Sequence, residues 1–126
     1  MAAYVLDGGT PVIRFDPQIE VSPFALFRRL REGDPPVLVD VRPASEAGEL
    51  SLAGAVAAGG PGWTPPPDRD VVLFDDDGAA AAAAATRLQA AGYSRVRALF
   101  GGLALYDFAL DPAVVGDEVF LVRRGA

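Results

Sequence analysis

The sequence of 126 residues contains no cysteine and no histidine, and its eleven basic residues are all arginine. The absence of cysteine excludes disulfides, thiolate metal ligands and thiol nucleophiles. The absence of histidine excludes imidazole metal sites and a Ser-His catalytic triad. Any acid–base chemistry must therefore use aspartate, glutamate, tyrosine or arginine.

The sequence also carries little positive charge and no long apolar segment. Its formal charge of −6 argues against nucleic acid or an anionic membrane as a partner, because both require a cationic surface. No apolar run approaches the ~20 residues of a membrane-spanning helix. The N-terminal residues MAAYVLDGG have neither the basic nor the apolar region of a signal peptide. We therefore expect a cytoplasmic protein.

The hydrophobic residues, 51% of the chain, are sufficient for the core of one globular domain. Continuous apolar runs at residues 37–41, 71–75 and 96–100 are typical of strands covered on both faces. Residues 54–58 predict a shorter strand. Helices are expected at residues 44–50, 79–91 and 101–110.

A further helix is predicted directly after Val21. Ser22 is a suitable N-cap, and Pro23 suits the first helical position. The apolar face of this helix is expected to consist of Phe24, Phe27 and Leu30.

Strands and helices alternate from Val21 to Leu110, which indicates an α/β fold. We expect a mainly parallel sheet of about five strands, with helices on both faces. Two β-prone runs around DGGT predict a hairpin within residues 1–18, and residues 118–124 predict a terminal strand. We therefore divide the chain into the hairpin extension (1–18), a central domain (19–110) and a C-terminal strand extension packing on that domain (111–126).

The segment FDDDGAAAAAAATRL places three carboxylates between a strand and a helix. Sites in open parallel sheets gather at the carboxyl ends of strands. The helix that follows offers unpaired N–H groups and about half a positive charge, which commonly bind phosphate, a sulfur anion or a carboxylate. Here we expect the chain to supply the anion itself, with Asp77 as N-cap and Asp75 or Asp76 folded back onto the remaining amides.

The segment VVLFDDDGAAAAAAATRLQAAGYSRVRALFGGLALY resembles the second half of a rhodanese-like domain. In that family an apolar strand ends in a catalytic cysteine, a glycine follows three residues later, and an alanine-rich helix leads to A-G-Y/F. VSPFALFRRL is similar to the opening helix of the family, and VLVDVRPASEAGELSLAGAV to its D-V-R…E…G-A segment. The resemblance covers residues 19–110.

The resemblance ends at the residues that carry the chemistry. It places Asp75 at the position of the sulfur-carrying cysteine. Because a carboxylate cannot accept and release sulfane sulfur as a thiolate does, the resemblance implies a rhodanese-like fold without sulfurtransferase activity. We expect no cofactor. The degenerate loop comprises Asp75, Asp76, Asp77, Gly78, Ala79 and Ala80. Further departures from common family residues are Ala80 and Ala81 for Arg and Ser, Ser51 for His, and Tyr106 for Trp.

Two alternative sites remain open for the acidic turn. The segment LFDDDGA also resembles the D-x-D-G motif of haloacid-dehalogenase-like phosphatases, in which Asp75 would be the nucleophile, Asp77 the general acid, and both would help hold Mg²⁺. Such enzymes also need a basic residue and further acidic residues downstream, for which about 50 residues leave little room. A simple cation site would need adjacent side chains, which point in different directions, to converge, so we expect solvated or self-capping acids and no metal.

The remaining candidates are structural or concern a partner. Asp40 is expected to bond neighbouring backbone, and Arg42 to brace the loop by pairing with Glu46 one helical turn away. Trp63, in the turn-rich segment GGPGWTPPP, either folds back onto the core or anchors an unknown protein partner. Unpaired terminal strands would also allow a homodimer.

Overall fold

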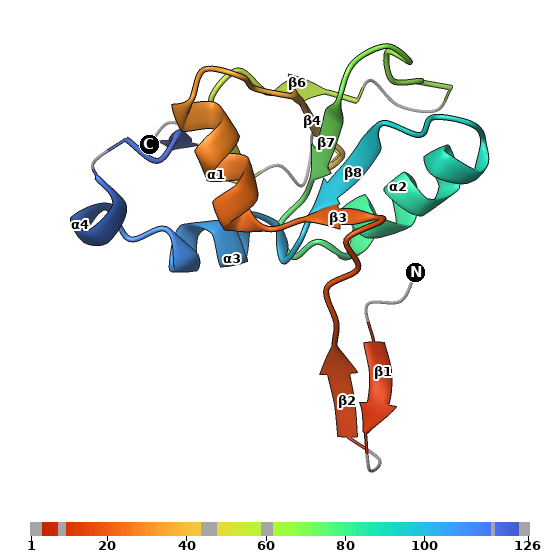
Figure 1. Cartoon of the computed structure of the whole chain (residues 1–126), viewed down its shortest axis with the longest axis horizontal. Helices are drawn as coiled ribbons and strands as arrows, with labels where there is room; N and C mark the ends of the chain where they lie inside the picture. Colours follow the sequence, from red (N-terminus) through yellow and green to blue (C-terminus); the bar gives the residue numbers. More distant parts are fainter. Residues whose placement is uncertain (1–3, 8–9, 44–47, 59–61, 117, 124–126) are drawn as a thin grey trace.

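The computed structural model describes residues 4–7, 10–43, 48–58, 62–116 and 118–123. Its centre is a parallel sheet of five strands in the order β3-β8-β7-β4-β6 (Figure 1). The strands are β3 (Glu20–Val21), β4 (Val37–Asp40), β6 (Val56–Ala57), β7 (Val71–Phe74) and β8 (Val96–Leu99). The predicted mainly parallel α/β architecture is therefore confirmed.

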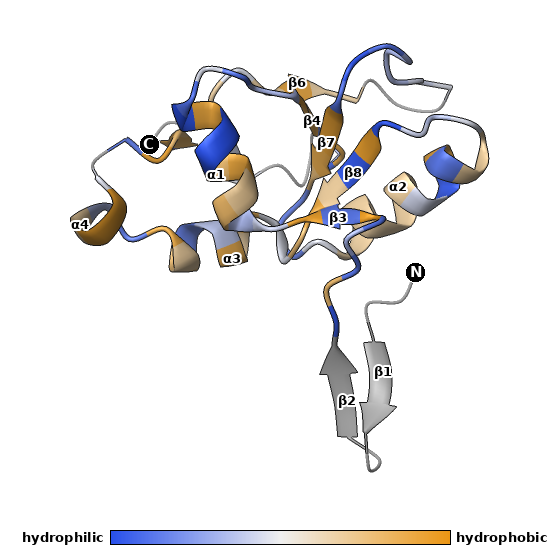
Figure 2. Cartoon of the chain, in the orientation of Figure 1, coloured by the Kyte–Doolittle hydropathy of each residue, from blue (hydrophilic) through white to orange (hydrophobic). Residues whose placement is uncertain are grey.

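Successive residues of the central strands point to opposite faces of the sheet, as the period of two requires. In β7, Val72 and Phe74 pack against helices α1 (Pro23–Arg31) and α3 (Gly102–Ala109). Val71 and Leu73 pack on the other face against α2 (Ala79–Ala90). Strand β7 is accordingly apolar along its whole length, whereas β3 and β8 each include a hydrophilic residue (Figure 2). Both faces of the sheet are covered by helices, as predicted.

Helix α1 begins as its sequence predicts. The Ser22 hydroxyl accepts a hydrogen bond from the Ala25 N–H at 3.1 Å, and Pro23 occupies the first helical position. The predicted apolar face is partly wrong, because Phe24 is 50% exposed and Leu26 is buried in its place beside Phe27. The face of the helix that packs on the core therefore differs slightly from the face predicted by the spacing of its phenylalanines.

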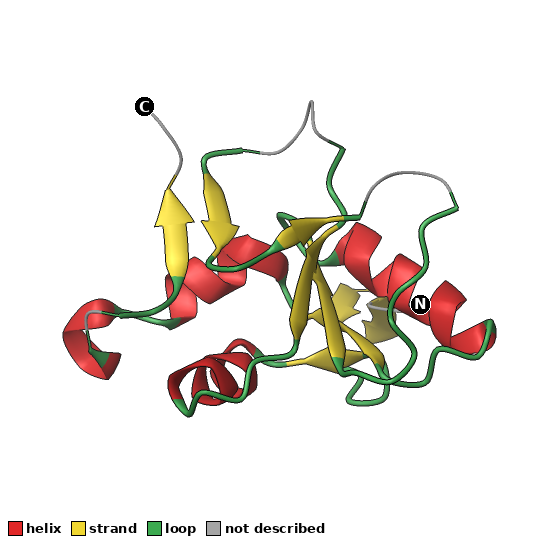
Figure 3. Cartoon of the chain, turned by 90° about the horizontal axis from the view of Figure 1, so that it is seen from above, coloured by secondary structure: helices red, strands yellow, loops and turns green. Residues whose placement is uncertain are grey.

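Short elements differ most from the prediction. Leu50 was expected to end a helix over residues 44–50 but begins strand β5 (Leu50–Leu52), and residues 44–47 lie outside the described part of the chain. β5 pairs antiparallel with β9 (Leu121–Arg123), and the two strands lie beside the main sheet rather than in it (Figure 3). The strand β3 and the one-turn helix α4 (Pro112–Val115) were not predicted.

The predicted N-terminal hairpin is present as β1 (Tyr4–Asp7) and β2 (Thr10–Ile13), which pair antiparallel and lie apart from the five-stranded sheet (Figure 1). The predicted C-terminal strand is present as β9. None of the helices in the described ranges has the length and apolar character required to cross a membrane.

Candidate functional site

The acidic turn lies at the carboxyl end of β7, a strand inside the sheet between β4 and β8. Asp75 follows the last residue of β7, and α2 begins four residues later at Ala79. Gly78 links the two elements in the left-handed conformation, with φ of 90°, which glycine adopts at little cost. The turn thus aims the first N–H groups of α2 back towards the end of the strand.

The Asp75 carboxylate occupies this group of amides. Its Oδ1 accepts from the Gly78 N–H at 2.7 Å, and its Oδ2 accepts from the Ala80 N–H at 2.9 Å. The residue is only 5% exposed. Burial raises the pKa of Asp75 above its ordinary value, in opposition to the amide hydrogen bonds, which lower it. Both carboxylate oxygens are therefore committed to the backbone that an incoming anion would use.

The two neighbouring aspartates have different partners. Asp76 Oδ1 accepts from Arg42 Nη1 at 2.9 Å, and Asp77 Oδ1 accepts from the Ala79 N–H at 2.9 Å. The expectation that Asp77 is the N-cap of α2 is wrong, because Gly78 occupies that position. The chain enters the helix through the left-handed Gly78, one residue later than expected. Asp77 therefore lies outside the helix and bonds the Ala79 N–H from there.

Arg42 is the centre of the loop's ionic contacts, and its side chain is 3% exposed. It pairs with Asp40 at 2.8 Å, donates to the Leu50 carbonyl at 2.9 Å, and lies over the Phe74 ring at 5.9 Å. With its bond to Asp76, it joins the end of β4, the acidic turn and the start of β5. Hydrogen bonding to Asp40 raises the pKa of Arg42, so the guanidinium stays charged.

The expected roles of the residues around Arg42 are placed only in part. Asp40 Oδ1 accepts from the Arg42 N–H at 2.9 Å, which is the backbone contact expected of it. The predicted pair of Arg42 with Glu46 cannot be placed, since Glu46 lies outside the described residues. The partner that spacing did not reveal is Asp76, 34 residues further along the chain.

Gly78 and Gly102 hold the turn against the start of α3. Gly78 belongs to the predicted loop, whereas Gly102 was not predicted to take part in the site. A Cβ on Gly102 would lie 2.6 Å from the Asp76 carbonyl, and one on Gly78 would lie 2.9 Å from the Gly101 nitrogen. The close approach allows the Asp75 and Asp76 carbonyls to accept from the Leu103 and Ala104 N–H groups at 2.9 and 3.0 Å. The Gly-Gly pair before the last helix was the available signal.

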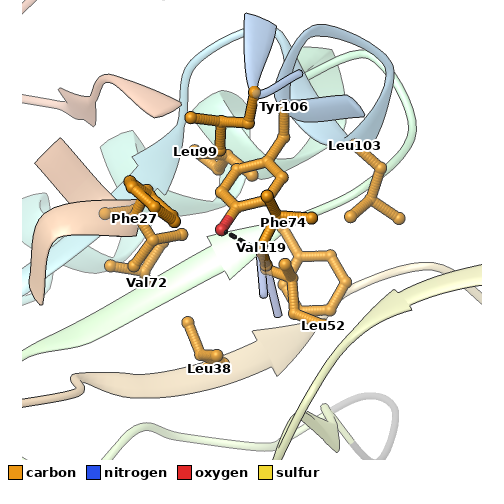
Figure 4. Packing of buried hydrophobic residues seen from close by; sticks show 11 residues of the cluster. Phe27, Leu38, Leu52, Val72, Phe74, Leu99, Leu103, Tyr106 and Val119 are labelled. Carbon is orange, nitrogen blue, oxygen red and sulfur yellow. Dashed lines mark hydrogen bonds between the residues drawn. The ribbon is translucent and has the colours of Figure 1, made fainter. Parts of the chain in front are cut away.

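Most of the other candidate positions are buried or partly buried. Ser51 is buried in β5. Tyr106 is fully buried, and its hydroxyl donates to the Val119 carbonyl at 2.7 Å (Figure 4). Trp63 is partly buried and packs against the cluster between the sheet and α2. Ala79 and Ala80 are exposed beside the turn, and Ala81 is buried in that same cluster.

The geometry offers little to a cation or to a cofactor. Asp75, Asp76 and Asp77 point to three different partners. Within the part of the chain that the structure describes, no group of three or more acidic residues is arranged to hold a metal ion. The exposed residues at the start of α2 are alanines, which supply neither an acid nor a base.

The fold of this protein is an α/β fold with a parallel sheet. A tight loop at the carboxyl end of a central strand wraps around the N-terminus of an alanine-rich helix. A family profile described as the rhodanese-like domain matches residues 24–107. The match covers more than half of the chain, so the chain belongs to the rhodanese-like domain family, as its resemblance indicated.

Solved structures agree with this assignment. The chain is similar to the rhodanese-like domain of a protein from Anabaena sp., with 25% identity and a TM-score of 0.61 over 75% of this chain and 76% of that one. It is similar to a Bacillus halodurans protein, with 20% identity and a TM-score of 0.60 over 74% of each chain. A search of curated proteins finds no match.

A thiosulfate sulfurtransferase from Pseudomonas aeruginosa is also similar, with 19% identity and a TM-score of 0.63. The match covers 74% of this chain but 19% of the sulfurtransferase. Identity at this level shows a shared fold alone. The activity of that enzyme cannot be transferred to a chain that has no cysteine.

Proposed function

We propose that this chain is a non-catalytic rhodanese-like module with a binding or regulatory role. The observation that carries the proposal is the contact of both Asp75 oxygens with the Gly78 and Ala80 amides. The resemblance implies that members of the family carry the sulfur-holding cysteine at this position. Here it carries a buried carboxylate that fills the anion-binding amides and cannot form a persulfide.

Charge supports the same proposal. Asp76 and Asp77 surround the turn with further negative charge, and Asp76 is 67% exposed at its side chain. Such a surface repels thiosulfate and phosphate monoesters. Arg42, which lies at the turn, is neutralised by two carboxylates and its side chain is 3% exposed, so it is not available to bind a substrate anion.

The rival proposal is a Mg²⁺-dependent phosphohydrolase that uses Asp75 and Asp77. Asp75 would have to leave two amide hydrogen bonds before it could attack phosphorus, and Asp77 Oδ1 is bound to the Ala79 N–H. A nucleophile is normally free at the moment of attack and held beside its general acid. The observed contacts therefore favour the non-catalytic module.

The test is an assay for sulfur transfer from thiosulfate to cyanide by the purified full chain. We expect no thiocyanate above the level seen without protein. Asp75→Cys is the informative variant, and we expect it to restore little activity, because Ala80 and Ala81 provide no cationic or hydroxyl support.

Two results would contradict the proposal. One is thiocyanate production by the unmodified chain that is lost in Asp75→Ala. The other is Mg²⁺-dependent release of phosphate from a phosphomonoester that is lost in Asp75→Asn but retained in Asp70→Asn, which alters a carboxylate at the opposite end of β7.

A further inference from the structure

The end of the chain fills a slot built by the domain. β9 pairs with β5 in the register Ser51↔Val122 and Leu52↔Leu121, and the Ala53 N–H donates to the Phe120 carbonyl at 2.9 Å. We call residues 118–123 the C-terminal arm. The arm lies outside the part of the chain that matches the family profile. A pair of short strands is not stable in isolation, so packing must hold this one.

The packing comes from the large core cluster. Val119 is 8% exposed and belongs to this cluster, and its carbonyl accepts from the Tyr106 hydroxyl at 2.7 Å (Figure 4). The Phe120 ring lies 6.2 Å from that of Phe27 on α1. The slot is therefore specific for this segment, because binding depends on the strand register, the Val119 carbonyl and the Phe120 ring.

The connection between α3 and the arm includes helix α4, whose Val115 packs against the large core cluster. Helix α4 is a single turn with no buried residue, and Gly116 after it has φ of 105°. Phe120 has φ of 66° and is, in the described ranges, the one non-glycine residue with positive φ. Such a conformation is strained for a bulky residue. Because Phe120 is part of the arm and its carbonyl accepts from the Ala53 N–H, this strain belongs to the filled slot and not to the connection.

Apolar surface is exposed along the same connection. Phe108 near the end of α3 is 85% exposed, and Val114 in α4 is 80% exposed. Among the exposed large hydrophobic residues that the structure describes, these two are the most exposed. Both residues precede the arm in the sequence.

We propose that the C-terminal arm exchanges between two copies, so that each arm fills the β5 slot of the other copy in a two-fold homodimer. The occupant is a second copy because the slot is shown to accept this very segment, and an exchanged arm makes every contact that the closed arm makes. Exchange replaces the turn at Gly116 by an extended connection. It also brings the two connections together, which covers Phe108 and Val114. The proposal gives the binding role proposed above a specific partner.

Single cysteines test the exchange, because the chain has none of its own. Ser51 and Val122 face each other across β5 and β9, at a Cα separation of about 4.5–5.5 Å that a disulfide can span. Tagged Ser51→Cys chain and untagged Val122→Cys chain are unfolded in urea, mixed in equal amounts, refolded and oxidised. We expect a disulfide-linked heterodimer on a non-reducing gel that disappears on reduction.

Each single variant treated alone serves as the control, and we expect it to stay uncrosslinked because Ser51 meets Val122 and not itself. Light scattering on the unmodified chain at increasing concentration should show a species of twice the mass. The double variant Ser51→Cys/Val122→Cys distinguishes an arm that exchanges from an arm that stays in its own copy. If it folds, by circular dichroism, and links only within one chain while the mixture gives no heterodimer, the arm stays in its own copy and the proposal is wrong.

Crosslinking of each single variant with itself would equally overturn it, since that result requires a different interface. Neither outcome depends on sulfur transfer. A monomeric chain without thiocyanate production would contradict the exchange and leave the non-catalytic role standing, and a catalytically active dimer would do the reverse.

Discussion

Asp75 is subject to two opposing electrostatic effects. Burial makes ionisation of its carboxyl group unfavourable, while the N–H groups of Gly78 and Ala80 favour the carboxylate. Burial is the larger effect, so the pKa of Asp75 rises above 3.8. At the other end of β7, the hydrogen bond from Arg95 is the largest cause that lowers the pKa of Asp70 below the same value. One strand is thus bounded by two carboxylates with opposite shifts.

These shifts predict opposite dependences of stability on pH. Above pH 3.8 and up to the raised pKa of Asp75, the folded chain binds more protons than the unfolded chain, so this group lowers stability as pH rises. The contribution of Asp70 is fully present above pH 3.8 and is lost as pH falls through its lowered pKa. Removing each titration separately should therefore change the pH profile in opposite directions.

The measurement is urea unfolding of Asp75→Asn, Asp70→Asn and the unmodified chain from acidic to neutral pH. As pH rises, we expect the free energy of unfolding of Asp75→Asn to increase relative to that of the unmodified chain. We expect that of Asp70→Asn to decrease relative to that of the unmodified chain. For Asp70, which is half-exposed, the change in the free energy of unfolding should be about 1 kcal/mol or less. Parallel profiles for the two variants would show that burial does not raise the pKa of Asp75.

At the scale of elements, the acidic turn is fixed by two helix N-termini and not by one. The start of α2 is satisfied by the Asp75 side chain, and the start of α3 by the Asp75 and Asp76 carbonyls. This arrangement needs the backbone of the turn to touch the backbone at Gly102. The shape of the degenerate loop is therefore preserved by contacts that do not involve the missing cysteine.

We expect Gly102→Ala to be strongly destabilising. Its Cβ would lie 2.6 Å from backbone atoms of Asp76 and Asp77, and its φ of 64° is unfavourable for alanine. Left-handed backbone costs about 1–2 kcal/mol, and the overlap adds about 1–3 kcal/mol. Gly33→Ala is the matched control, because Gly33 has φ of 79° with no atom within 4 Å. Equal losses in the free energy of unfolding would contradict the close contact.

The sequence predicted the long elements well and the short ones poorly. Residues 37–41, 71–75 and 96–100 were identified as strands because they are predominantly apolar, and β4, β7 and β8 lie within those ranges. β3 and β5 contain two and three residues, and their conformation is set by the strands beside them. No local pattern in residues 44–50 could reveal that Leu50 pairs with Arg123.

The site divides in the same way. The contact of Asp75 with the amides was foreseeable, because an acidic residue directly before a helix has local N–H groups to bond. The bond between Arg42 and Asp76 was not, since 34 residues separate them and only the folded sheet brings the ends of β4 and β7 together. Distance along the chain, rather than chemistry, limited what the sequence could show.

At the scale of the whole molecule, the part of the chain that matches the family is not a complete structural unit. The largest fully buried side chain in the described residues is Tyr106, which lies within the matched region, yet its hydroxyl donates to Val119 in the C-terminal arm. Burial raises the pKa of Tyr106 well above its ordinary value, so the phenol remains a donor. The arm therefore completes the core of the domain.

Tyr106→Phe tests that claim without altering the packing of the ring. The Val119 carbonyl would lose its buried donor, which costs about 1–3 kcal/mol of the free energy of unfolding. Tyr93→Phe is the control, because Tyr93 is only partly buried and a surface change of this kind costs about 0.5 kcal/mol or less. Urea unfolding gives both values. If the two variants lose the same stability, the arm is attached to the surface and does not complete the core, and the slot described for exchange would lose its most specific contact.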